Sequence, residues 1–165
     1  MTVSRWLPAY IGIGSNLKKP SQQVASAFEA IGNIPETRLV LRSSLYRSSP
    51  LGGVEQPDFV NAVTGILTRL DAHDLLAELK RIEQRRGRER DGPRWGPRVL
   101  DLDILVFASH VINEDGLTIP HAGIAERNFV LLPLLEIAPQ LEIPGLGRLS
   151  SLPVDDTEPA IERIV

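Results

Sequence analysis

Apolar residues recur along the chain with two different periods, and the switch between them predicts alternating strands and helices. Apolar residues at every second position are typical of a strand, whereas spacings of three and four are typical of an amphipathic helix. Helical spacing is clearest at Val24, Ala27, Phe28 and Ile31, behind a proline at position 20 that suits a helix start. The whole pattern predicts strands at 9–14, 37–47, 59–68 and 101–107, helices at 20–32 and 71–87, and a hairpin turn at 115–116.

The order of these elements predicts the fold class. A β-α-β-β-α-β order that includes a hairpin is typical of an α+β protein, in which a mostly antiparallel sheet carries helices packed on it. The chain has 165 residues and 42% hydrophobic content, which suits one domain with its own core. We therefore expect a single domain over residues 1–165, in which residues 1–9 and the tail 140–165 have the least informative patterns.

Finer patterns predict the shapes of three segments. Leu39, Leu41 and Leu45 are expected to share one face of a single strand. Residues 14–16, Gly-Ser-Asn, are expected to form a tight turn from a strand into a helix, because the lysine and spacing of a phosphate-binding glycine loop are absent. A later helix is expected to start near Leu132, because a proline is best tolerated in the first turn of a helix.

Two acidic residues, Asp101 and Asp103, interrupt an apolar run that otherwise predicts a buried strand. Residues two apart in a strand share a face, so both carboxylates are expected to point the same way, with Cα atoms about 6.8 Å apart. Buried carboxylates need partners, so this strand predicts a cation site, and the alternative is a solvated sheet edge. Leu105 and Phe107 are expected to continue the acidic face, opposite a face formed by Leu100, Leu102, Ile104 and Val106.

An arginine-rich segment lies directly before these acids. Seven arginines and three acids between positions 81 and 98 give a local positive surplus, although the chain has a net charge of -3. A compact cationic segment suits a small anion better than a nucleic acid, which needs a broad basic face. Guanidinium groups beside a divalent ion held by two carboxylates can bind a polyphosphate, whereas the alternative is a solvated basic surface.

Composition excludes several classes of chemistry. The chain contains no cysteine, so disulfides, thiolate zinc sites and cysteine nucleophiles are excluded. The first residues have no long apolar run of the kind found in signal peptides, and no run approaches the roughly 18 apolar residues of a membrane span. We expect a cytoplasmic monomer with no nucleic-acid or membrane partner.

Other positions carry side chains suited to a ligand. Phe59 and Asn61 share a strand face, where they could stack on a flat heterocycle and hydrogen-bond its edge. The alternative is a core phenylalanine beside a solvated asparagine. His121 follows a proline at a strand end, which suits either a structural or a ligand-binding histidine. The segment 48–58 is rich in glycine and proline and long enough to be a binding loop.

Several short segments together resemble one family of enzymes. The most specific is RWGPRVLDLDIL at 94–105. The others follow in the order and spacing typical of that family: IGIGSNL (11–17), LYRSSPLG (45–52), QPDFVNAV (56–63), IEQRRGRER (82–90), IPH (119–121) and ERNFVLLPLLEIAP (126–139). On these residues the chain resembles the 6-hydroxymethyl-7,8-dihydropterin pyrophosphokinases of folate biosynthesis. The resemblance implies a ferredoxin-like α+β sandwich and transfer of the β,γ-diphosphate of ATP to the hydroxymethyl group of the pterin, releasing AMP.

The resemblance also implies a role for each matching residue. Two Mg²⁺ ions would be held by Asp101 and Asp103, with ATP and a reduced pterin as substrates. The pterin would be bound by Ser48, Ser49, Leu51, Phe59, Asn61 and Phe129. ATP would be bound by Leu76, Lys80, Glu83, Arg90, Trp95, Arg98, Ile104, His121 and Arg127. Arg88 and Arg98 would act in catalysis beside the two aspartates, on a loop that closes over the triphosphate.

Three positions differ from the pattern expected of that family. Ser49 replaces a common proline, Lys80 a neutral glutamine and Ala122 an aromatic residue. Two other functions also stay open from the residues alone. A nucleotide hydrolase or γ-phosphate kinase could use the same carboxylates and would release ADP, although no Walker or protein-kinase motif is present. A non-catalytic nucleic-acid-binding module would need exposed aromatic residues on a basic face, whereas aromatic residues make up only 5% of the chain.

Overall fold

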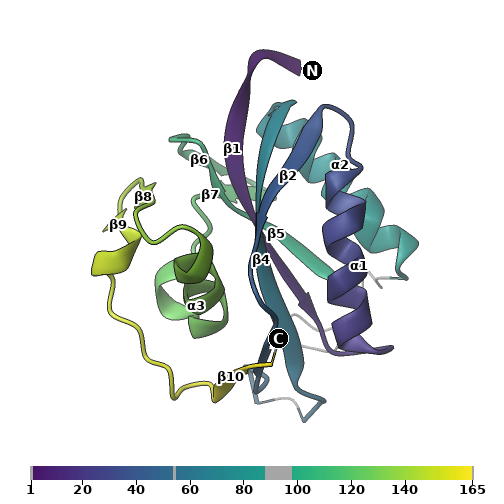
Figure 1. Ribbon diagram of the computed structural model, residues 1–165, viewed down its shortest axis with the longest axis vertical. Helices are drawn as coiled ribbons and strands as arrows, with labels where there is room; N and C mark the ends of the chain where they lie inside the picture. Colours follow the sequence, from purple (N-terminus) through teal and green to yellow (C-terminus); the bar gives the residue numbers. More distant parts are fainter. Residues whose placement is uncertain (1, 54, 88–97, 165) are drawn as a thin grey trace.

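The computed structural model describes residues 2–53, 55–87 and 98–164, and its centre is a six-stranded sheet (Figure 1). Every pairing in this sheet is antiparallel, in the order β10-β3-β4-β1-β5, and β2 pairs with the same strand β4 as β3 does. The predicted α+β class is therefore confirmed. The strands span β1 Thr2–Ser15, β2 Thr37–Arg42, β3 Tyr46–Ser48, β4 Phe59–Leu70, β5 Asp101–Phe107 and β10 Ile161–Arg163.

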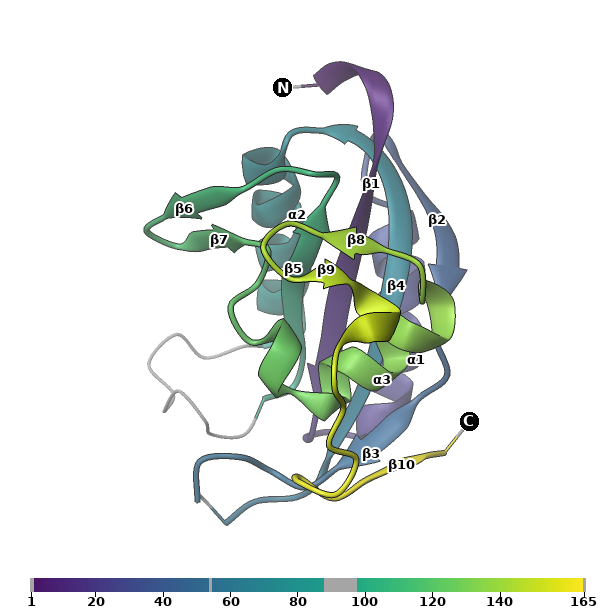
Figure 2. The ribbon, with the colours of Figure 1, turned by 90° about the vertical axis from the view of Figure 1, so that its left-hand side faces the viewer.

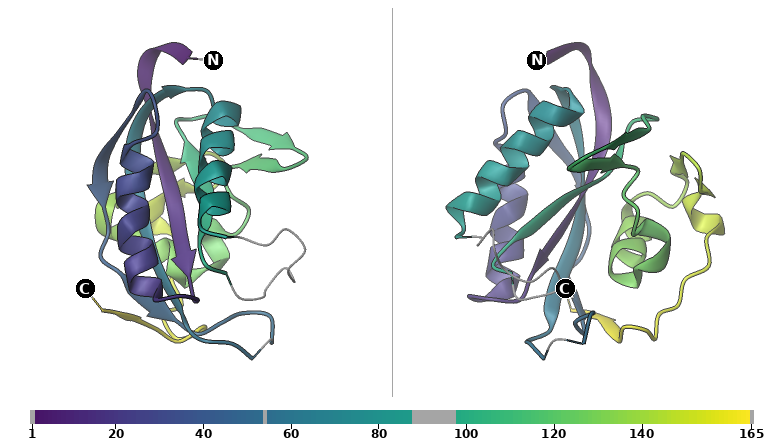
Figure 3. Two further views of the ribbon diagram at one scale, coloured as in Figure 1. Left: turned by 90° about the vertical axis from the view of Figure 1, so that its right-hand side faces the viewer. Right: turned by 180° about the vertical axis from the view of Figure 1, so that it is seen from behind.

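Two helices, α1 (Pro20–Gly32) and α2 (Ala72–Arg85), lie side by side on one face of the sheet (Figure 3, left). The predicted stripe of α1 is buried, and Pro20 occupies the helix start as expected. Asp71 caps α2 by accepting a hydrogen bond from the Asp74 backbone N–H at 2.8 Å. Leu75, Leu79 and Ile82 of α2 pack with the α1 stripe into an apolar core. Hydrophobic burial accounts for the attachment of both helices.

The third helix, α3 (Asn128–Ile137), packs on the opposite face (Figure 3, right). It begins four residues earlier than predicted, so Pro133 lies inside the helix. A proline there removes the hydrogen bond to the carbonyl four residues before it, and its ring crowds that carbonyl. Burial of Val130, Leu131 and Leu134 in a second core stabilises the helix despite that loss. The small strands β8 (Glu142–Ile143) and β9 (Gly147–Arg148) cover the outer side of this core.

The segment 37–47 forms two strands, so the predicted single strand is wrong. The register between β2 and β4 shifts between Leu39 and Leu41. Leu39 therefore packs in the core of α1 and α2, whereas Leu41 lies beside Gly65 and is 41% exposed. A β-bulge inserts one residue and reverses the alternation of side chains beyond it.

A similar irregularity divides β5. Its register with β1 shifts between the pairs Tyr10–Val106 and Ile11–Ile104. As a result Phe107 packs in the core of α1 and α2, and Val106 in the core of α3, which reverses both predictions. Before the bulge the alternation holds, because Leu102 and Ile104 pack towards the helix pair and Leu105 towards α3. Bulges cannot be identified from period-two spacing.

Both ends of the chain contribute strand residues that the sequence did not predict, namely the first part of β1 and all of β10. β1 starts at Thr2, and β10 pairs with β3 at the sheet edge. The predicted hairpin is confirmed as β6 (Ile112–Glu114) and β7 (Leu117–Ile119), joined by a two-residue turn. Among the described residues, no helix is long and apolar enough to cross a membrane.

Candidate active site

A cleft of about 530 Å³ lies mainly on the α3 face of the sheet, between β1, β4 and β5 on one side and α3 with the β6–β7 hairpin on the other. It reaches Leu76 of α2 past the edge strand β5. Most of the predicted site residues line it, although they come from segments far apart in the sequence. They are Ser48, Ser49, Leu51, Phe59, Asn61, Leu76, Arg98, Asp101, Asp103, Ile104, His121, Arg127 and Phe129. The fold therefore brings together residues predicted for both substrates.

Asp101 and Asp103 lie on the cleft side of β5. In the register of the sheet they stand opposite Gly14 and Gly12 of β1. The two glycines belong to the strand, so the predicted turn at 14–16 begins only after Ser15. Side chains at these positions would project from the floor of the cleft beside the carboxylates. The sequence pattern did not reveal that Gly12 and Gly14 leave room beside the carboxylates, because G-x-G suggests a phosphate loop first. The pattern that indicates this role is two glycines at alternate strand positions, paired with the two acids of D-x-D.

His121 lies beside the acids, with its Nε2 4.0 Å from Asp103 Oδ2. Burial lowers the pKa of His121, and the positive charge of Arg127 lowers it further, against an opposing effect of Asp101. The imidazole is therefore neutral at pH 7. Its Nδ1 accepts a hydrogen bond from the Gly123 backbone N–H at 3.0 Å. This assigns the proton to Nε2, so the ring presents an N–H donor to the cleft.

Gly123 also makes room for Arg127. A Cβ atom at position 123 would lie 2.6 Å from Arg127 Nε, which is too close for any side chain. A larger residue here would displace the end of the Arg127 side chain from its present position, and no local pattern in the sequence indicates this contact. With Arg98, Arg127 supplies positive charge to the end of the cleft that holds the two acids.

The other end of the cleft is aromatic and amide-lined. Phe59 begins β4, and Phe129 is the second residue of α3. Asn61, also in β4, is 5% exposed and donates from Nδ2 to Ser48 Oγ at 2.8 Å and to the Tyr46 carbonyl at 3.4 Å. Its Oδ1 lies on the side of Gly14, 3.6 Å from where a Cβ on that glycine would be. The amide is thus held in one orientation, and the sequence-based pairing of Phe59 with Asn61 is reproduced on one face.

Five residues predicted for the ATP site or for catalysis are not part of the described cleft. Glu83 is 5% exposed, and its carboxylate accepts a hydrogen bond from the Leu102 backbone N–H at 2.7 Å. It therefore connects α2 to β5 from behind the two aspartates. Lys80 is exposed on α2 and does not line the cleft. The others, Arg88, Arg90 and Trp95, lie outside the described residues.

The carboxylate pair fits a magnesium site that a substrate completes. Among residues 2–53, 55–87 and 98–164 there is no group of three or more acidic or histidine side chains that could hold a metal alone. Mg²⁺ usually binds through one or two carboxylates together with phosphate oxygens and water. Asp101 and Asp103 supply such a partial set, and the side chain of Asp103 is 45% exposed. The donor set therefore suits Mg²⁺ that arrives with a polyphosphate.

An α+β sandwich with paired carboxylates, arginines and a neutral imidazole at one end of a cleft, and aromatic rings at the other, defines a nucleotide-dependent transferase. The family model for 7,8-dihydro-6-hydroxymethylpterin-pyrophosphokinase (HPPK) matches residues 10–139. The chain belongs to this family.

Individual relatives agree with this assignment. The chain is 49% identical over 146 residues to the 2-amino-4-hydroxy-6-hydroxymethyldihydropteridine pyrophosphokinase of Haemophilus influenzae, covering 88% of this chain and 91% of the relative. It is 45% identical over 155 residues to the Pseudomonas aeruginosa enzyme of the same name, covering 94% and 95%. The wild-type HPPK-DHPS of Plasmodium falciparum, crystallised with pteroate, has the same fold, with a TM-score of 0.71 at 14% identity. That match covers 90% of this chain and only 42% of the longer protein.

Proposed function

We infer that the protein transfers the diphosphate of ATP to the hydroxymethyl group of 6-hydroxymethyl-7,8-dihydropterin and releases AMP. The observation that carries this inference is the division of one cleft into two ends. Carboxylates and arginines suited to a metal-bound polyphosphate line one part of it, and a buried amide and two phenylalanines line another. A reaction that joins a polyphosphate to a flat heterocycle requires both ends to be open to the same space.

At the charged end, we propose that Asp101 and Asp103 hold two Mg²⁺ ions together with phosphate oxygens of ATP. Bound there, the ions would neutralise phosphate charge and lower the pKa of the attacking hydroxyl. Arg98 and Arg127 line the same end, and their guanidinium groups are suited to the charge that spreads over the transferred group and the AMP. The neutral His121 offers its Nε2–H to a phosphate oxygen. Arg88, Arg90 and Trp95 are proposed for the triphosphate from the sequence alone.

At the aromatic end, we propose that Phe59 and Phe129 bind the two faces of the pterin. The ring edge needs polar partners as well as stacking, because buried donors and acceptors must be paired. Asn61 supplies them, since its Nδ2 donates to the Tyr46 carbonyl, which can only accept, and to Ser48. The backbone at Ser48, Ser49 and Leu51 borders the same end.

The adenosine end of ATP has fewer candidates. Leu76 and Ile104 line the cleft beyond the acids and are suited to apolar contact with the nucleotide. Lys80 and Glu83 were proposed for the same role. The position of Glu83 behind Leu102 favours an indirect effect through β5. We also propose that the active protein is a monomer; light scattering coupled to size-exclusion chromatography tests this.

Product identity tests the function. The protein is mixed with ATP, Mg²⁺ and 6-hydroxymethyl-7,8-dihydropterin, and the nucleotides and pterins are separated by ion-exchange chromatography. AMP and pterin diphosphate should form in equal amounts, and neither should form when the pterin or Mg²⁺ is omitted. Release of ADP would instead support the hydrolase or γ-phosphate kinase and overturn the proposal.

A further inference from the structure

The C-terminal segment 155–163, whose sequence predicted no role, reaches both walls of the aromatic end of the cleft. Figure 2 shows this yellow segment passing α3 and continuing into β10, which lies alongside β3. Ile161 stands opposite Ser48 in that pairing. Ser49 donates its backbone N–H to the Ala160 carbonyl at 3.0 Å. The segment is therefore bonded to the wall formed by the residues proposed to read the pterin edge.

Asn128 bonds the same segment to the opposite wall. It is the first residue of α3, directly before Phe129, and is 3% exposed. Its Nδ2 donates to the backbone carbonyl of Asp155 at 2.9 Å and to that of Pro159 at 2.8 Å. Both amide protons are thus used to hold the segment against the start of α3.

The other half of this amide has no such use. Asn128 Oδ1 is buried and has no hydrogen-bond partner among the described residues. The donor half of the Asn128 amide therefore makes the contacts that hold the segment.

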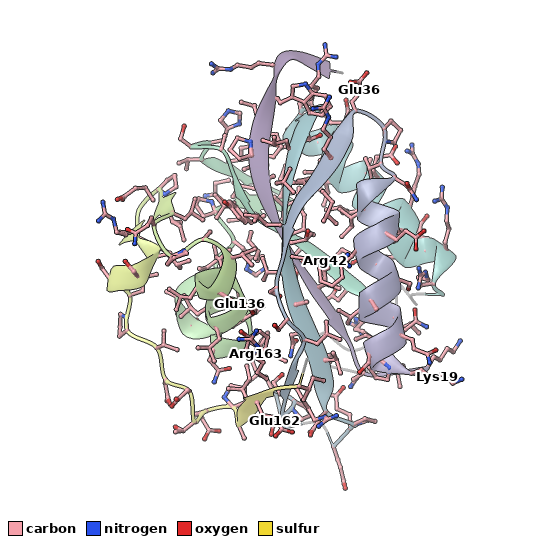
Figure 4. The ribbon with its side chains drawn as sticks, in the orientation of Figure 1. Lys19, Glu36, Arg42, Glu136, Glu162 and Arg163 are labelled. Atoms are coloured by element: carbon pink, nitrogen blue, oxygen red, sulfur yellow. The ribbon has the colours of Figure 1, made fainter. Side chains whose placement is uncertain are left out.

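The far end of α3 is attached by a different set of polar contacts. Glu136 accepts hydrogen bonds from Tyr46 Oη at 2.7 Å and from the Ser44 backbone N–H at 3.0 Å. Arg163 Nη2 of β10 lies 3.6 Å from Glu136 Oε2, and Figure 4 shows these two side chains between α3 and the sheet. The C-terminal segment therefore contacts α3 at both ends of the helix. Contacts at both ends of the helix oppose its movement away from the sheet.

We propose that residues 155–163 form a strap across the aromatic end of the cleft, and that Asn128 is a positioning residue for the pterin. Asn128 touches no substrate; it sets the distance between Phe129 and the Ser48–Ser49 wall through the strap. Two aromatic faces bind a flat ring only at van der Waals spacing, so a shift of one wall weakens stacking and edge contacts together. This proposal rests on the pterin site described above.

Steady-state kinetics of the full chain test the strap. Asn128→Ala removes both hydrogen bonds, and Asn128→Asp removes the donor while keeping the volume and placing a carboxylate that a helix N-terminus tolerates. Both variants should raise the KM for the pterin by about 5- to 20-fold, below the roughly hundredfold that a 1 Å misplacement can cost. The KM for ATP should change less than about twofold. Asp156→Asn, an exposed change in the same segment, is the matched control and should leave both KM values unchanged.

Calorimetric titration of the pterin, with Mg²⁺ and a non-hydrolysable ATP analogue present, separates the possible outcomes. Weaker pterin binding in the variants, with unchanged binding of the analogue, supports the strap. Equal losses for both ligands, or lower thermal stability with unchanged pterin affinity, would show that Asn128 is merely structural and overturn it. If wild-type protein binds the analogue but no pterin, the pterin site itself is wrong and the strap falls with it. If wild-type protein binds pterin and the variants match it, only the strap is wrong.

Discussion

The two faces of the central sheet differ in what holds their helices, although both come from the same strands. On one face, α1 and α2 pack mainly through an apolar core, to which Glu83 of α2 adds a buried hydrogen bond with the Leu102 backbone. On the other face, α3 is held partly by polar contacts, and beside it β5 presents Asp101 and Asp103 to the cleft. Neighbours in β5 thus belong to different environments, since Leu102 faces the apolar core. Because side chains alternate between the two faces of a strand, a residue that stabilises the core and a residue that serves the reaction can be neighbours in the sequence.

The largest effect should follow from neutralising an acid on the cleft face. Asp103→Asn removes half of the carboxylate pair proposed for Mg²⁺, so kcat should fall by about 10²–10³-fold or more. Stability should change by no more than about 1 kcal/mol, because a half-exposed side chain is replaced by an isosteric one. Coupled assay of AMP release and urea unfolding measure the two effects.

Asp101→Asn serves as the partner experiment for this comparison. In the double variant, the losses of kcat caused by the two single changes should not multiply, because both changes remove parts of one site. If either single variant kept near wild-type turnover, the metal assignment would be wrong. A large loss of stability in these variants would also contradict the separation between the two faces.

On the apolar face, the opposite pattern is expected. Leu79→Ala in α2 empties a fully buried position, so the free energy of unfolding should fall by about 2–5 kcal/mol. Because Leu79 does not line the cleft, kcat per folded molecule should stay within about threefold of wild type. Urea unfolding and active-site titration measure these quantities, and Ala77→Ser on the exposed side of α2 is the control. A selective loss of kcat in correctly folded Leu79→Ala would show that the two faces are not independent.

Sequence patterns predicted the helix stripes, the hairpin and the acid pair, because each depends on local spacing. They did not predict the bulges in β2 and β5, which are set by pairing with strands far away in sequence. In the cleft, the same limit applies to Gly123, which lies close to the Arg127 side chain, and to Asn128, whose hydrogen-bond partners lie in the C-terminal segment. Motif resemblance located most of the site, but it carried no information about contacts that the family pattern does not include.

The polar attachment of α3 should make this face depend on acid pH. Burial by itself would raise the pKa of Glu136, but hydrogen bonds from Tyr46 and Ser44 and the charge of Arg163 lower it below its usual 4.5. A lowered folded-state pKa contributes stability above about pH 4.5, and this contribution is lost as the pH falls through the folded value. Glu136→Gln should therefore cost about 1–2 kcal/mol at pH 7, and the difference from wild type should shrink below pH 4.5.

Urea unfolding from pH 7 down to the acid limit of the native state measures this difference. Glu142→Gln, in the exposed β8, is the control and should show no comparable dependence. Tyr46→Phe removes one of the hydrogen bonds and should reproduce part of the loss at pH 7. A Glu136→Gln penalty that stays constant as the pH falls would show that lost packing, and not the carboxylate charge, explains it.

The smallest effect concerns an exposed contact between α2 and the β6–β7 hairpin. His73 Nε2 lies 2.8 Å from Glu114 Oε2, and this hydrogen bond, together with the charge of Glu114, raises the pKa of His73 above 6.5. A raised folded-state pKa gives a contribution to stability that is present below pH 6.5 and lost as the pH rises through the folded value. Glu114→Gln should return the pKa of His73 towards 6.5, as measured by NMR titration, with kcat unchanged. Because both side chains are more than half exposed, solvent screens the pair, and no change in unfolding midpoint at pH 8 is expected. If the pKa of His73 did not respond to Glu114→Gln, the contact between the two side chains would not help to place the hairpin over the cleft.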